Sequence, residues 1–148
     1  MPTLYVSDLD GTLLTPTATL SPYTRDTLNR LIASGLPFAV ATSRSVSSVG
    51  PIFQGVSLRF PVIELNGAYV TDLQTGKHLI VNNIASDLAA NLLQLIQAEE
   101  ISPLMSTYSG QHDNVYFSIT TNPGIQWYID DAERNEDGRW HYCRDLTT

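Results

Sequence analysis

Three short apolar runs in the first 67 residues constrain the fold of this chain more than any other feature. They occupy residues 3–7, 37–41 and 61–65. Continuous apolar runs of this length are typical of strands buried on both faces of a sheet. The segments between them predict helices, one beginning at Ser21-Pro22 and ending at Gly35, and a shorter one over 45–54. This alternation predicts a parallel, doubly wound α/β sheet with right-handed crossovers.

Polar side chains follow each apolar run, where the expected strand ends. They are Asp8 and Asp10 after the first run, Thr42, Ser43 and Arg44 after the second, and Asn66 after the third. Parallel strands place their carboxyl ends at one edge of the sheet, and ligands of open α/β sheets bind at that edge. We therefore expect these six residues to surround one site, with Gly11 allowing a tight turn after the aspartates.

The types of side chain at this edge suit phosphoryl transfer. A carboxylate at a strand tip can act as a nucleophile, as in enzymes that form an aspartyl-phosphate. A second acid two residues away can protonate a leaving oxygen and later deprotonate water. Mg²⁺ prefers carboxylate and carbonyl oxygens, so the Asp8 side chain and the Asp10 backbone carbonyl would suit it. The hydroxyls of Thr42 and Ser43 can donate hydrogen bonds to phosphoryl oxygens.

Each of these features also has a purely structural interpretation. The two aspartates can belong to an exposed turn, and Thr42 and Ser43 can cap the helix that follows them. Arg44 can be a solvated surface charge, and Asn66 with the glycine after it is a strong turn signal. The three histidines have no ligand spacing, so we expect them at surface or interface positions: His78, His112 and His141.

The strand-helix rhythm is lost beyond residue 67. A hairpin is expected over 68–81 with its turn at 74–77, and then a helix from Ser86, as its cap, to about Glu99. Two antiparallel strands, 104–108 and 115–119, precede a helix that begins at Asn122-Pro123. This change of pattern divides the chain into residues 1–83 and a second α/β module over 84–148.

Charge and composition narrow the classes of partner. The net charge is −7 and Lys77 is the only lysine, which argues against a nucleic-acid or anionic membrane surface. A small phosphorylated partner remains compatible, because local dipoles and a bound metal can hold phosphate. No apolar run reaches the ~18 residues of a membrane span, and the single cysteine, Cys143, fits a reducing compartment. We expect a cytoplasmic protein; the sequence makes no prediction of oligomeric state.

The motifs at the expected sheet edge resemble the signatures of the haloacid dehalogenase (HAD) superfamily. Asp8-Leu9-Asp10-Gly11-Thr12 is similar to the first signature, and Thr42 after an apolar strand is similar to the second. Thr42-Ser43-Arg44 resembles the Thr-Gly-Arg of the Cof-like, type IIB branch, with Ser43 in place of glycine. Asn66-Gly67-Ala68 is similar to the Asn-Gly-Ala of that branch, and residues 124–128 are similar to its cap domain.

The resemblance implies a Rossmann-like HAD core with an α+β cap domain, and a role for each matching residue. Residues 1–83 would be the N-terminal part of the core with its hairpin, and 84–148 a partial cap. Asp8 would be the nucleophile and a metal ligand, and Asp10 the general acid/base with its carbonyl on Mg²⁺. The Leu9 amide and Thr42 would hold the phosphoryl group, and the remaining site residues would contact substrate: Ser43, Arg44 and Asn66. Most such proteins are phosphatases of small phosphorylated metabolites, often sugar phosphates. The resemblance thus implies a Mg²⁺-dependent phosphatase that acts through an aspartyl-phosphate.

The chain departs from this family after the second signature. The family requires a third-motif lysine and a fourth-motif acidic pair that completes the Mg²⁺ site. Lys77 lies in the expected hairpin turn, and Asp130-Asp131 lie in an expected helix without the usual Gly-Asp context. We therefore expect the chain to be the N-terminal part of a longer phosphatase, ending inside the cap. The alternative is a truncated or degenerate, catalytically inactive chain that serves at most as a binding or interaction module.

Overall fold

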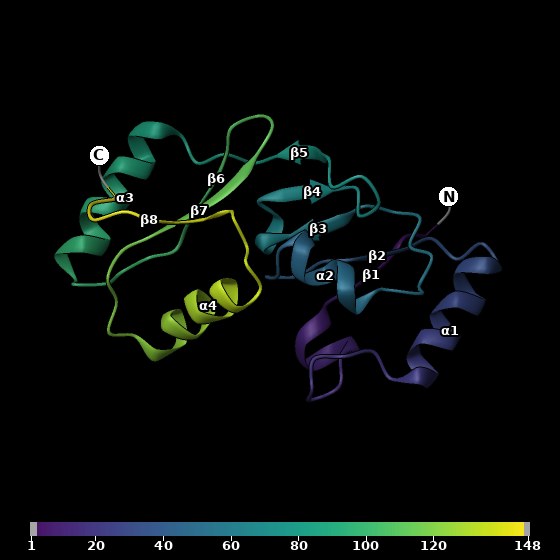
Figure 1. Cartoon of the computed structure of the whole chain (residues 1–148). Coiled ribbons are helices and arrows are strands. Elements are labelled where there is room, and N and C mark those ends of the chain that lie inside the picture. Colours follow the sequence, from purple (N-terminus) through teal and green to yellow (C-terminus); the bar gives the residue numbers. More distant parts are fainter. Residues whose placement is uncertain (1–2, 147–148) are drawn as a thin grey trace. The chain divides into compact units, whose positions relative to one another are not determined.

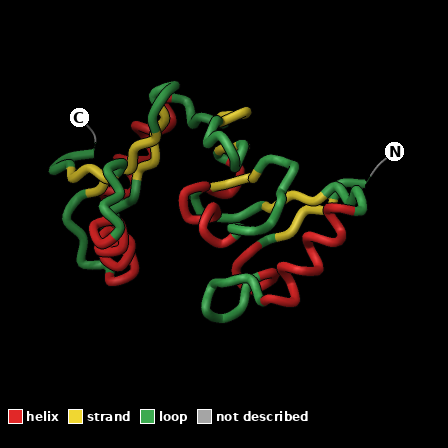
Figure 2. The backbone as a smooth tube through the Cα atoms, turned by 45° about the vertical axis from the view of Figure 1, so that its right-hand side comes forward, coloured by secondary structure: helices red, strands yellow, loops and turns green. Residues whose placement is uncertain are grey.

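The computed structural model describes residues 3–146, which form two compact units that divide between Asn83 and Ile84 (Figure 1). The first unit contains β1 (Tyr5–Ser7), α1 (Pro22–Ala33), β2 (Phe38–Val40), α2 (Val46–Ile52), β3 (Val62–Glu64), β4 (Tyr69–Thr71) and β5 (His78–Val81). The second contains α3 (Ser86–Ala98), β6 (Met105–Tyr108), β7 (Asp113–Phe117), α4 (Pro123–Arg134) and β8 (Trp140–Tyr142). Figure 2 distinguishes the helices from the strands and loops. The predicted mixed α/β class is confirmed.

The first three strands are parallel, as the alternation of strands and helices predicts. β1 pairs with β2, with Tyr5 opposite Phe38. Ala41, just after β2, forms a parallel bridge with Ile63 of β3, so β2 lies between β1 and β3. The predicted hairpin, β4 and β5, continues from β3 in antiparallel pairing, with Glu64 opposite Tyr69. The carboxyl ends of β1, β2 and β3 therefore share one edge.

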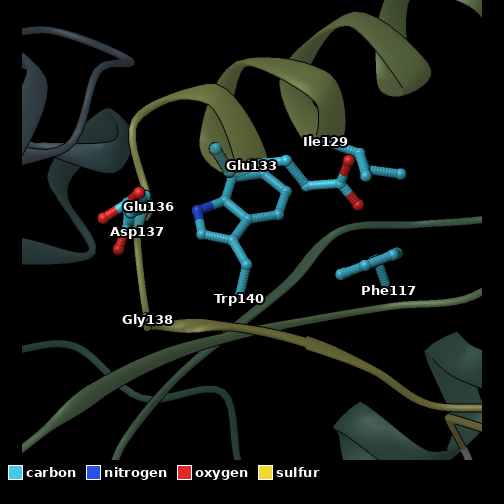
Figure 3. A pocket seen from close by; sticks show the side chains of 8 residues that line it. Phe117, Ile129, Glu133, Glu136, Asp137, Gly138 and Trp140 are labelled. Atoms are coloured by element: carbon cyan, nitrogen blue, oxygen red, sulfur yellow. The ribbon is translucent and has the colours of Figure 1, made fainter.

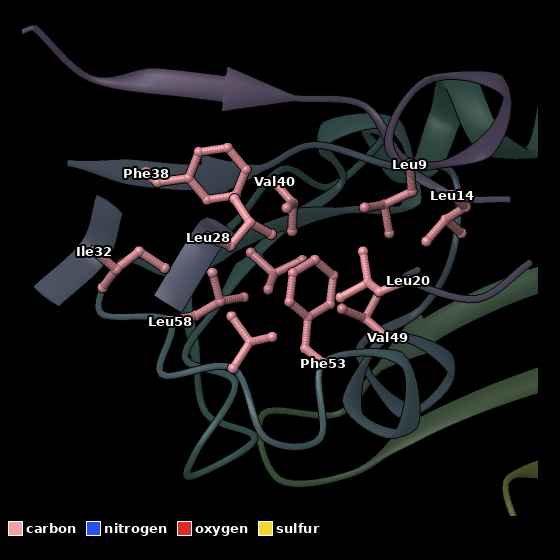
Figure 4. Packing of buried hydrophobic residues seen from close by; sticks show 12 residues of the cluster. Leu9, Leu14, Leu20, Leu28, Ile32, Phe38, Val40, Val49, Phe53 and Leu58 are labelled. Atoms are coloured by element: carbon pink, nitrogen blue, oxygen red, sulfur yellow. The ribbon is translucent and has the colours of Figure 1, made fainter. Parts of the chain in front are cut away.

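The hydrophobic core of the first unit lies between one face of these strands and both helices (Figure 4). α1 contributes Leu28 and Ile32, and α2 contributes Val49. Phe38 and Val40 of β2 join the same cluster, because alternate residues of a strand share a face. Two right-handed crossovers that step in the same direction place their helices on one face. The expected doubly wound sheet is thus wound on a single face in the part of the chain that the structure describes.

The second unit has a three-stranded sheet in the order β6-β7-β8. β6 and β7 are antiparallel, as predicted, although β7 begins at Asp113 rather than at residue 115. β8 is parallel to β7, and α4 connects the two, burying Ile129 and Ala132. α3 buries no residue. Among residues 3–146, no helix is long and apolar enough to cross a membrane.

Capping side chains explain where two of the longer helices begin. Ser21 accepts a hydrogen bond from the amide of Thr24 at 3.0 Å, and Asn122 accepts from Gly124 at 2.9 Å, as the sequence predicts. The prediction for Ser86 is wrong: this serine is the first helical residue, and the cap position is Ala85, without a side-chain hydrogen bond. The helix begins at Ser86 without this contribution, and Asp87 in its first turn interacts favourably with the positive end of the helix dipole.

Candidate active site

The loops after β1, β2 and β3 meet at one edge of the sheet, as the sequence predicts. The Arg44 guanidinium donates two hydrogen bonds to the Asp10 carboxylate, from Nε to Oδ2 and from Nη2 to Oδ1, each 2.7 Å long. The amide of Asn66 donates to the Thr42 carbonyl at 3.0 Å, and the amide of Leu65 donates to the Arg44 carbonyl at 3.2 Å. These four bonds join all three loops into one cluster.

The first loop is a wide turn anchored by an apolar residue between the two aspartates. Leu9 is fully buried, whereas Asp8 and Asp10 are exposed on either side of it. The Leu9 carbonyl accepts from the amide of Leu14 at 2.9 Å, which closes the turn. Gly11 has φ +73°, a conformation that glycine adopts without steric cost. Burial of Leu9 therefore points both carboxylates toward solvent at the strand tip.

The Asp8 carboxylate and the backbone amide of Leu9 form a hydrogen-bonded pair at the end of β1. Asp8 Oδ1 accepts a hydrogen bond from the amide of Leu9 at 2.6 Å. The Leu9 amide, which the family resemblance assigns to the phosphoryl group, thus points to the side of the turn where the Asp8 carboxylate lies. A phosphoryl group bound to Asp8 would lie within reach of the same amide.

Arg44 controls the charge of Asp10. The hydrogen bonds from this guanidinium hold the pKa of the Asp10 carboxyl below its ordinary value, and its positive charge acts in the same direction, whereas burial opposes both. The side chains are 30% exposed for Arg44 and 50% exposed for Asp10. Asp10 is therefore deprotonated while it is paired with Arg44. Arg44 is part of the cluster and not an isolated surface charge.

Thr42 is buried, and its hydroxyl faces the loop it begins. Its Oγ1 accepts from the amide of Arg44 at 3.1 Å, which leaves the hydroxyl proton available for donation. The helix-capping interpretation of Thr42 and Ser43 is not what the structure shows: the cap position of α2 is Ser45. Ser43 is exposed beside Thr42.

Asn66 lies at the centre of a left-handed turn after β3. Leu65, Asn66 and Gly67 have φ of +47°, +55° and +91°. Only glycine tolerates this region freely, and a branched residue such as Leu65 is strained in it. Strained turns of this kind are common at functional sites. The turn exposes the Asn66 side chain at the shared edge while its amide bonds the Thr42 carbonyl.

The donor atoms at this edge make a partial magnesium site. Mg²⁺ needs one or two carboxylates, with water and substrate oxygens completing its coordination. Asp8 and Asp10 meet that minimum with exposed oxygens. Within residues 3–146 no cluster of three or more His, Cys, Asp or Glu side chains can hold a metal ion. The chemistry of the donors fits Mg²⁺, and a third acidic ligand is not among the described residues.

Lys77 and the acidic pair lie in the elements that the sequence predicts, a hairpin turn and a helix. Lys77 is exposed in the β4–β5 turn, where its carbonyl accepts from the amide of Asp72 at 3.0 Å. Asp130 and Asp131 are inside α4, bonded to Gln126 and Arg134. Asp130 and Asp131 therefore do not follow a strand, as a fourth signature requires.

Sequence reasoning missed a buried polar group next to the site. Glu64 ends β3 and is 1% exposed, and it contacts Thr71 and His78, which are also buried. The surface or interface position expected for His78 is therefore wrong, because the β4–β5 hairpin folds this histidine onto the core. An acidic residue inside an apolar run was the one available signal, since an unpaired charge is costly there.

The second unit has a separate hollow of about 180 Å³ beneath α4 (Figure 3). Its walls include the indole of Trp140, the ring of Phe117 and three acidic residues, Glu133, Glu136 and Asp137. Hydrogen bonds from Arg139 hold the pKa of Asp137 below its ordinary value. The hollow contains none of the residues that the sequence singles out for chemistry.

Fold and site together define an α/β protein with a parallel sheet. Two exposed carboxylates, Asp8 and Asp10, follow its first strand, and Arg44 and the buried Thr42 follow the second. The chain belongs to the haloacid dehalogenase-like hydrolase family, whose model matches residues 5–141. The resemblance of its motifs to that family is thereby confirmed.

Individual relatives are similar to this chain over part of their length. The pyridoxal phosphate phosphatase YbhA of Escherichia coli (strain K12) is 33% identical over 98 residues, which cover 66% of this chain and 36% of the relative. A putative phosphatase of Buchnera aphidicola subsp. Baizongia pistaciae (strain Bp) is 31% identical over 134 residues, covering 90% and 48%. The matched part of this chain thus spans less than half of either relative.

Solved structures share the fold. A haloacid dehalogenase-like hydrolase from B. subtilis superposes with a TM-score of 0.72 at 19% identity, covering 97% of this chain and 55% of that one. Another from Bacteroides thetaiotaomicron superposes with a TM-score of 0.69 at 20% identity, covering 99% and 53%. At these identities the likeness concerns the fold alone.

Proposed function

We propose that the protein to which this chain belongs is a phosphatase of small phosphorylated metabolites that acts through an aspartyl-phosphate on Asp8. One observation carries this proposal: hydrogen bonds join the loops that carry Asp8 and Asp10, Thr42 and Arg44, and Asn66 into one cluster at the carboxyl edge of the sheet. Membership of a hydrolase family and relatives named as phosphatases support the same reaction class.

The proposed reaction has two steps. An Asp8 oxygen attacks phosphorus, the phosphorus–oxygen bond to the alcohol breaks, and Asp10 gives its proton to the leaving oxygen. Asp10 then takes a proton from water as that water attacks the phosphorus, and inorganic phosphate leaves with Asp8 regenerated. The Leu9 amide and the Thr42 hydroxyl donate to the phosphoryl oxygens as negative charge develops on them.

The Arg44–Asp10 ion pair is, in this proposal, the arrangement before substrate binds. It keeps Asp10 deprotonated, whereas the first step requires a protonated acid. A phosphate group is a better partner for a guanidinium than a single exposed carboxylate, because it offers more charge and more acceptor oxygens. Substrate that draws Arg44 away from Asp10 would let Asp10 take up the proton it must donate.

Mg²⁺ is the proposed cofactor, held by the Asp8 carboxylate and the Asp10 backbone carbonyl. When bound, this cation would offset the repulsion between Asp8 and an approaching phosphate. Asp8 and Asp10 are both exposed at the strand tip, which leaves room for the water ligands that Mg²⁺ retains.

The proposed substrate class follows from the relatives. Besides the pyridoxal phosphate phosphatase, they include a 5-amino-6-(5-phospho-D-ribitylamino)uracil phosphatase of Bacillus subtilis (strain 168), 29% identical over 119 residues. An HMP-PP phosphatase of Serratia proteamaculans (strain 568) is 33% identical over 86 residues. We also propose that the protein is cytoplasmic, since the one cysteine of these 148 residues, Cys143, is a free thiol, as is usual in a reducing compartment.

Replacement of the proposed nucleophile tests the reaction. In the complete product of the reading frame that contains these residues, Asp8→Asn should lower turnover of a panel of phosphate monoesters by about 10⁴-fold or more. Asp26→Asn, an exposed aspartate of α1, is the matched control and should retain full activity. Comparable turnover by Asp8→Asn and the unmodified enzyme, measured as phosphate release with Mg²⁺ present, would rule out nucleophilic catalysis by Asp8.

A second candidate is a catalytically inactive chain that only binds a partner. It is favoured by the positions of Lys77 in a hairpin turn and of Asp130 and Asp131 inside α4, where none of them ends a parallel strand. Hydrolysis of p-nitrophenyl phosphate by the 148-residue chain alone, dependent on Mg²⁺ and abolished by Asp8→Asn, would exclude this candidate.

A further inference from the structure

A buried polar cluster lies beneath the site and has no part in the proposed chemistry. It consists of Glu64 at the end of β3, Thr71 at the end of β4 and His78 at the start of β5, which are 1%, 0% and 9% exposed. Glutamate is almost never fully buried unless it is paired, because the interior disfavours its charge. The burial of Glu64 therefore has to be explained by the groups that its carboxylate contacts.

The Thr71 hydroxyl links the Glu64 carboxylate to the His78 ring. The Thr71 hydroxyl donates to Glu64 Oε1, and His78 Nδ1 lies 2.6 Å from the same hydroxyl oxygen and 3.5 Å from Glu64 Oε1. Because the threonine has one proton and gives it to Glu64, His78 Nδ1 must be the donor in the second contact. The His78 ring stacks on Tyr69 at 4.2 Å between centroids, which fixes its orientation. The hairpin thus holds Glu64 Oε1 in place.

The other oxygen of Glu64 reaches the site loop. Glu64 Oε2 accepts a hydrogen bond from the amide of Val46, the first residue of α2. That amide follows directly on the segment 42–45, which contains Thr42 and Arg44. Helix α2 has no side-chain cap of its own at Ser45, so Glu64 supplies the acceptor that the first turn of the helix lacks.

Residues 63–66 form hydrogen bonds along the whole length of the Thr42–Val46 loop. The amide of Thr42 donates to the Ile63 carbonyl at 2.9 Å, and the amides of Leu65 and Asn66 donate to the carbonyls of Arg44 and Thr42. These three bonds are made by the backbone. The Glu64 carboxylate makes the fourth, at the far end of the loop, and it alone depends on the identity of a side chain.

We propose that Glu64, fixed by Thr71 and His78, is a positioning residue that sets the conformation of the Thr42–Val46 loop and so the placement of Thr42 and Arg44. A carboxylate suits this position because both of its oxygens face donors. An amide would fit only if its NH₂ group faced Thr71, with the Thr71 hydroxyl turned toward His78 Nδ1 and the tautomer of that ring changed. An apolar side chain would leave both donors without an acceptor. The proposal rests on the proposed function only in its effect on turnover; the conformational part stands on the contacts alone.

Amide hydrogen exchange tests the conformational part without reference to activity. In the complete protein, Glu64→Leu, which removes the acceptor, should accelerate exchange of the Val46 amide by about tenfold or more, while the Val40 amide in β2 stays protected. Unchanged protection at Val46 would overturn the proposal. If Glu64→Leu does not fold, Thr71→Val and Thr71→Ser form a matched pair: valine removes the hydroxyl, whereas serine retains it. Val46 should exchange faster in the valine variant only, and equal exchange in the two would overturn the proposal.

Steady-state kinetics test the catalytic part. With the enzyme concentration corrected for the folded fraction, Thr71→Val and Glu64→Leu should lower kcat by about 10- to 100-fold with KM changed less than about threefold, and Thr71→Ser should match the unmodified enzyme. A merely structural role would lower yield and Tm but leave kcat per folded molecule unchanged, which would overturn the positioning role. If the unmodified enzyme hydrolyses no phosphate ester, the proposed function fails, and hydrogen exchange still decides the role of Glu64.

Discussion

At the scale of single residues, the site depends on conformations that most side chains avoid. Gly11 has φ +73° in the turn that carries Asp10, and a Cβ built there meets no atom within 4 Å. Gly50, inside α2, also has open space around it but an ordinary helical conformation. The first glycine is therefore required by its backbone angle and not by crowding, and the second is required by neither.

A pair of alanine substitutions separates these two causes. Gly11→Ala should lower the free energy of unfolding by about 1 kcal/mol, because an L side chain is strained at positive φ. Gly50→Ala should change it by less than about 0.5 kcal/mol, because the lower entropy cost of alanine in a helix is opposed by contact of the new Cβ with the ring of Pro51, the next residue. Urea denaturation of the complete protein measures both. Equal effects of the two substitutions would contradict the assignment of strain to the Gly11 backbone.

At the scale of elements, the two long helices of the second unit begin differently. Asn122 Oδ1 accepts from the amides of Gly124 and Ile125 at 2.9 and 3.2 Å and satisfies two orphan donors of α4. Ala85, at the corresponding position of α3, offers no side-chain acceptor. α4 is therefore anchored at its start by one side chain, as well as by the burial of Ile129 and Ala132.

Removal of the α4 cap should have a measurable cost. Asn122→Ala should destabilise the protein by about 1 kcal/mol, because two helix amides lose their acceptor. Asn122→Asp keeps an acceptor beside the positive end of the helix dipole and should be neutral within about 0.5 kcal/mol. Denaturant titration followed by far-ultraviolet circular dichroism provides the comparison. An alanine variant as stable as the aspartate variant would show that the cap contributes nothing.

At the scale of the whole molecule, the described residues leave much apolar surface exposed. Leu4, just before β1, and Tyr5 and Val6 of β1 are about half exposed, at 47%, 52% and 48%. β2 is the one strand that pairs with β1 in the part of the chain described. Exposed apolar strands with an unpaired edge are sites of association.

The 148-residue chain, expressed alone, should therefore associate in solution. Size-exclusion chromatography with light scattering should show species heavier than the 16.3 kDa monomer. Tyr5→Lys should reduce association, because a charge on an edge strand opposes pairing with another chain. Tyr23→Lys, at a 77% exposed position on α1, is the control and should not. A monodisperse monomer with a reversible, cooperative melt would contradict this expectation.

The parallel strands and the residues at their carboxyl edge were predictable because both depend on neighbours along the chain. Apolar runs select strands, and the polar residues that end them are brought to one edge by the direction of the strands. Thr42 and Asn66 therefore meet in the structure as expected, through a backbone bond of 3.0 Å. That Thr42 and Ser43 do not cap α2 was not predictable. The acceptor for the first amide of this helix, at Val46, is the side chain of Glu64 in β3, which is distant in sequence.

The sequence by itself determined the α/β class, the parallel edge and the carboxylate pair Asp8 and Asp10, because these follow from local apolar pattern and strand direction. Only the tertiary structure decided that Arg44 binds Asp10, 34 residues away, and that His78 is buried against Glu64. The physical reason is the same for both. The partner of a charged group depends on which loops and hairpin strands fold beside it, and no local propensity encodes that choice.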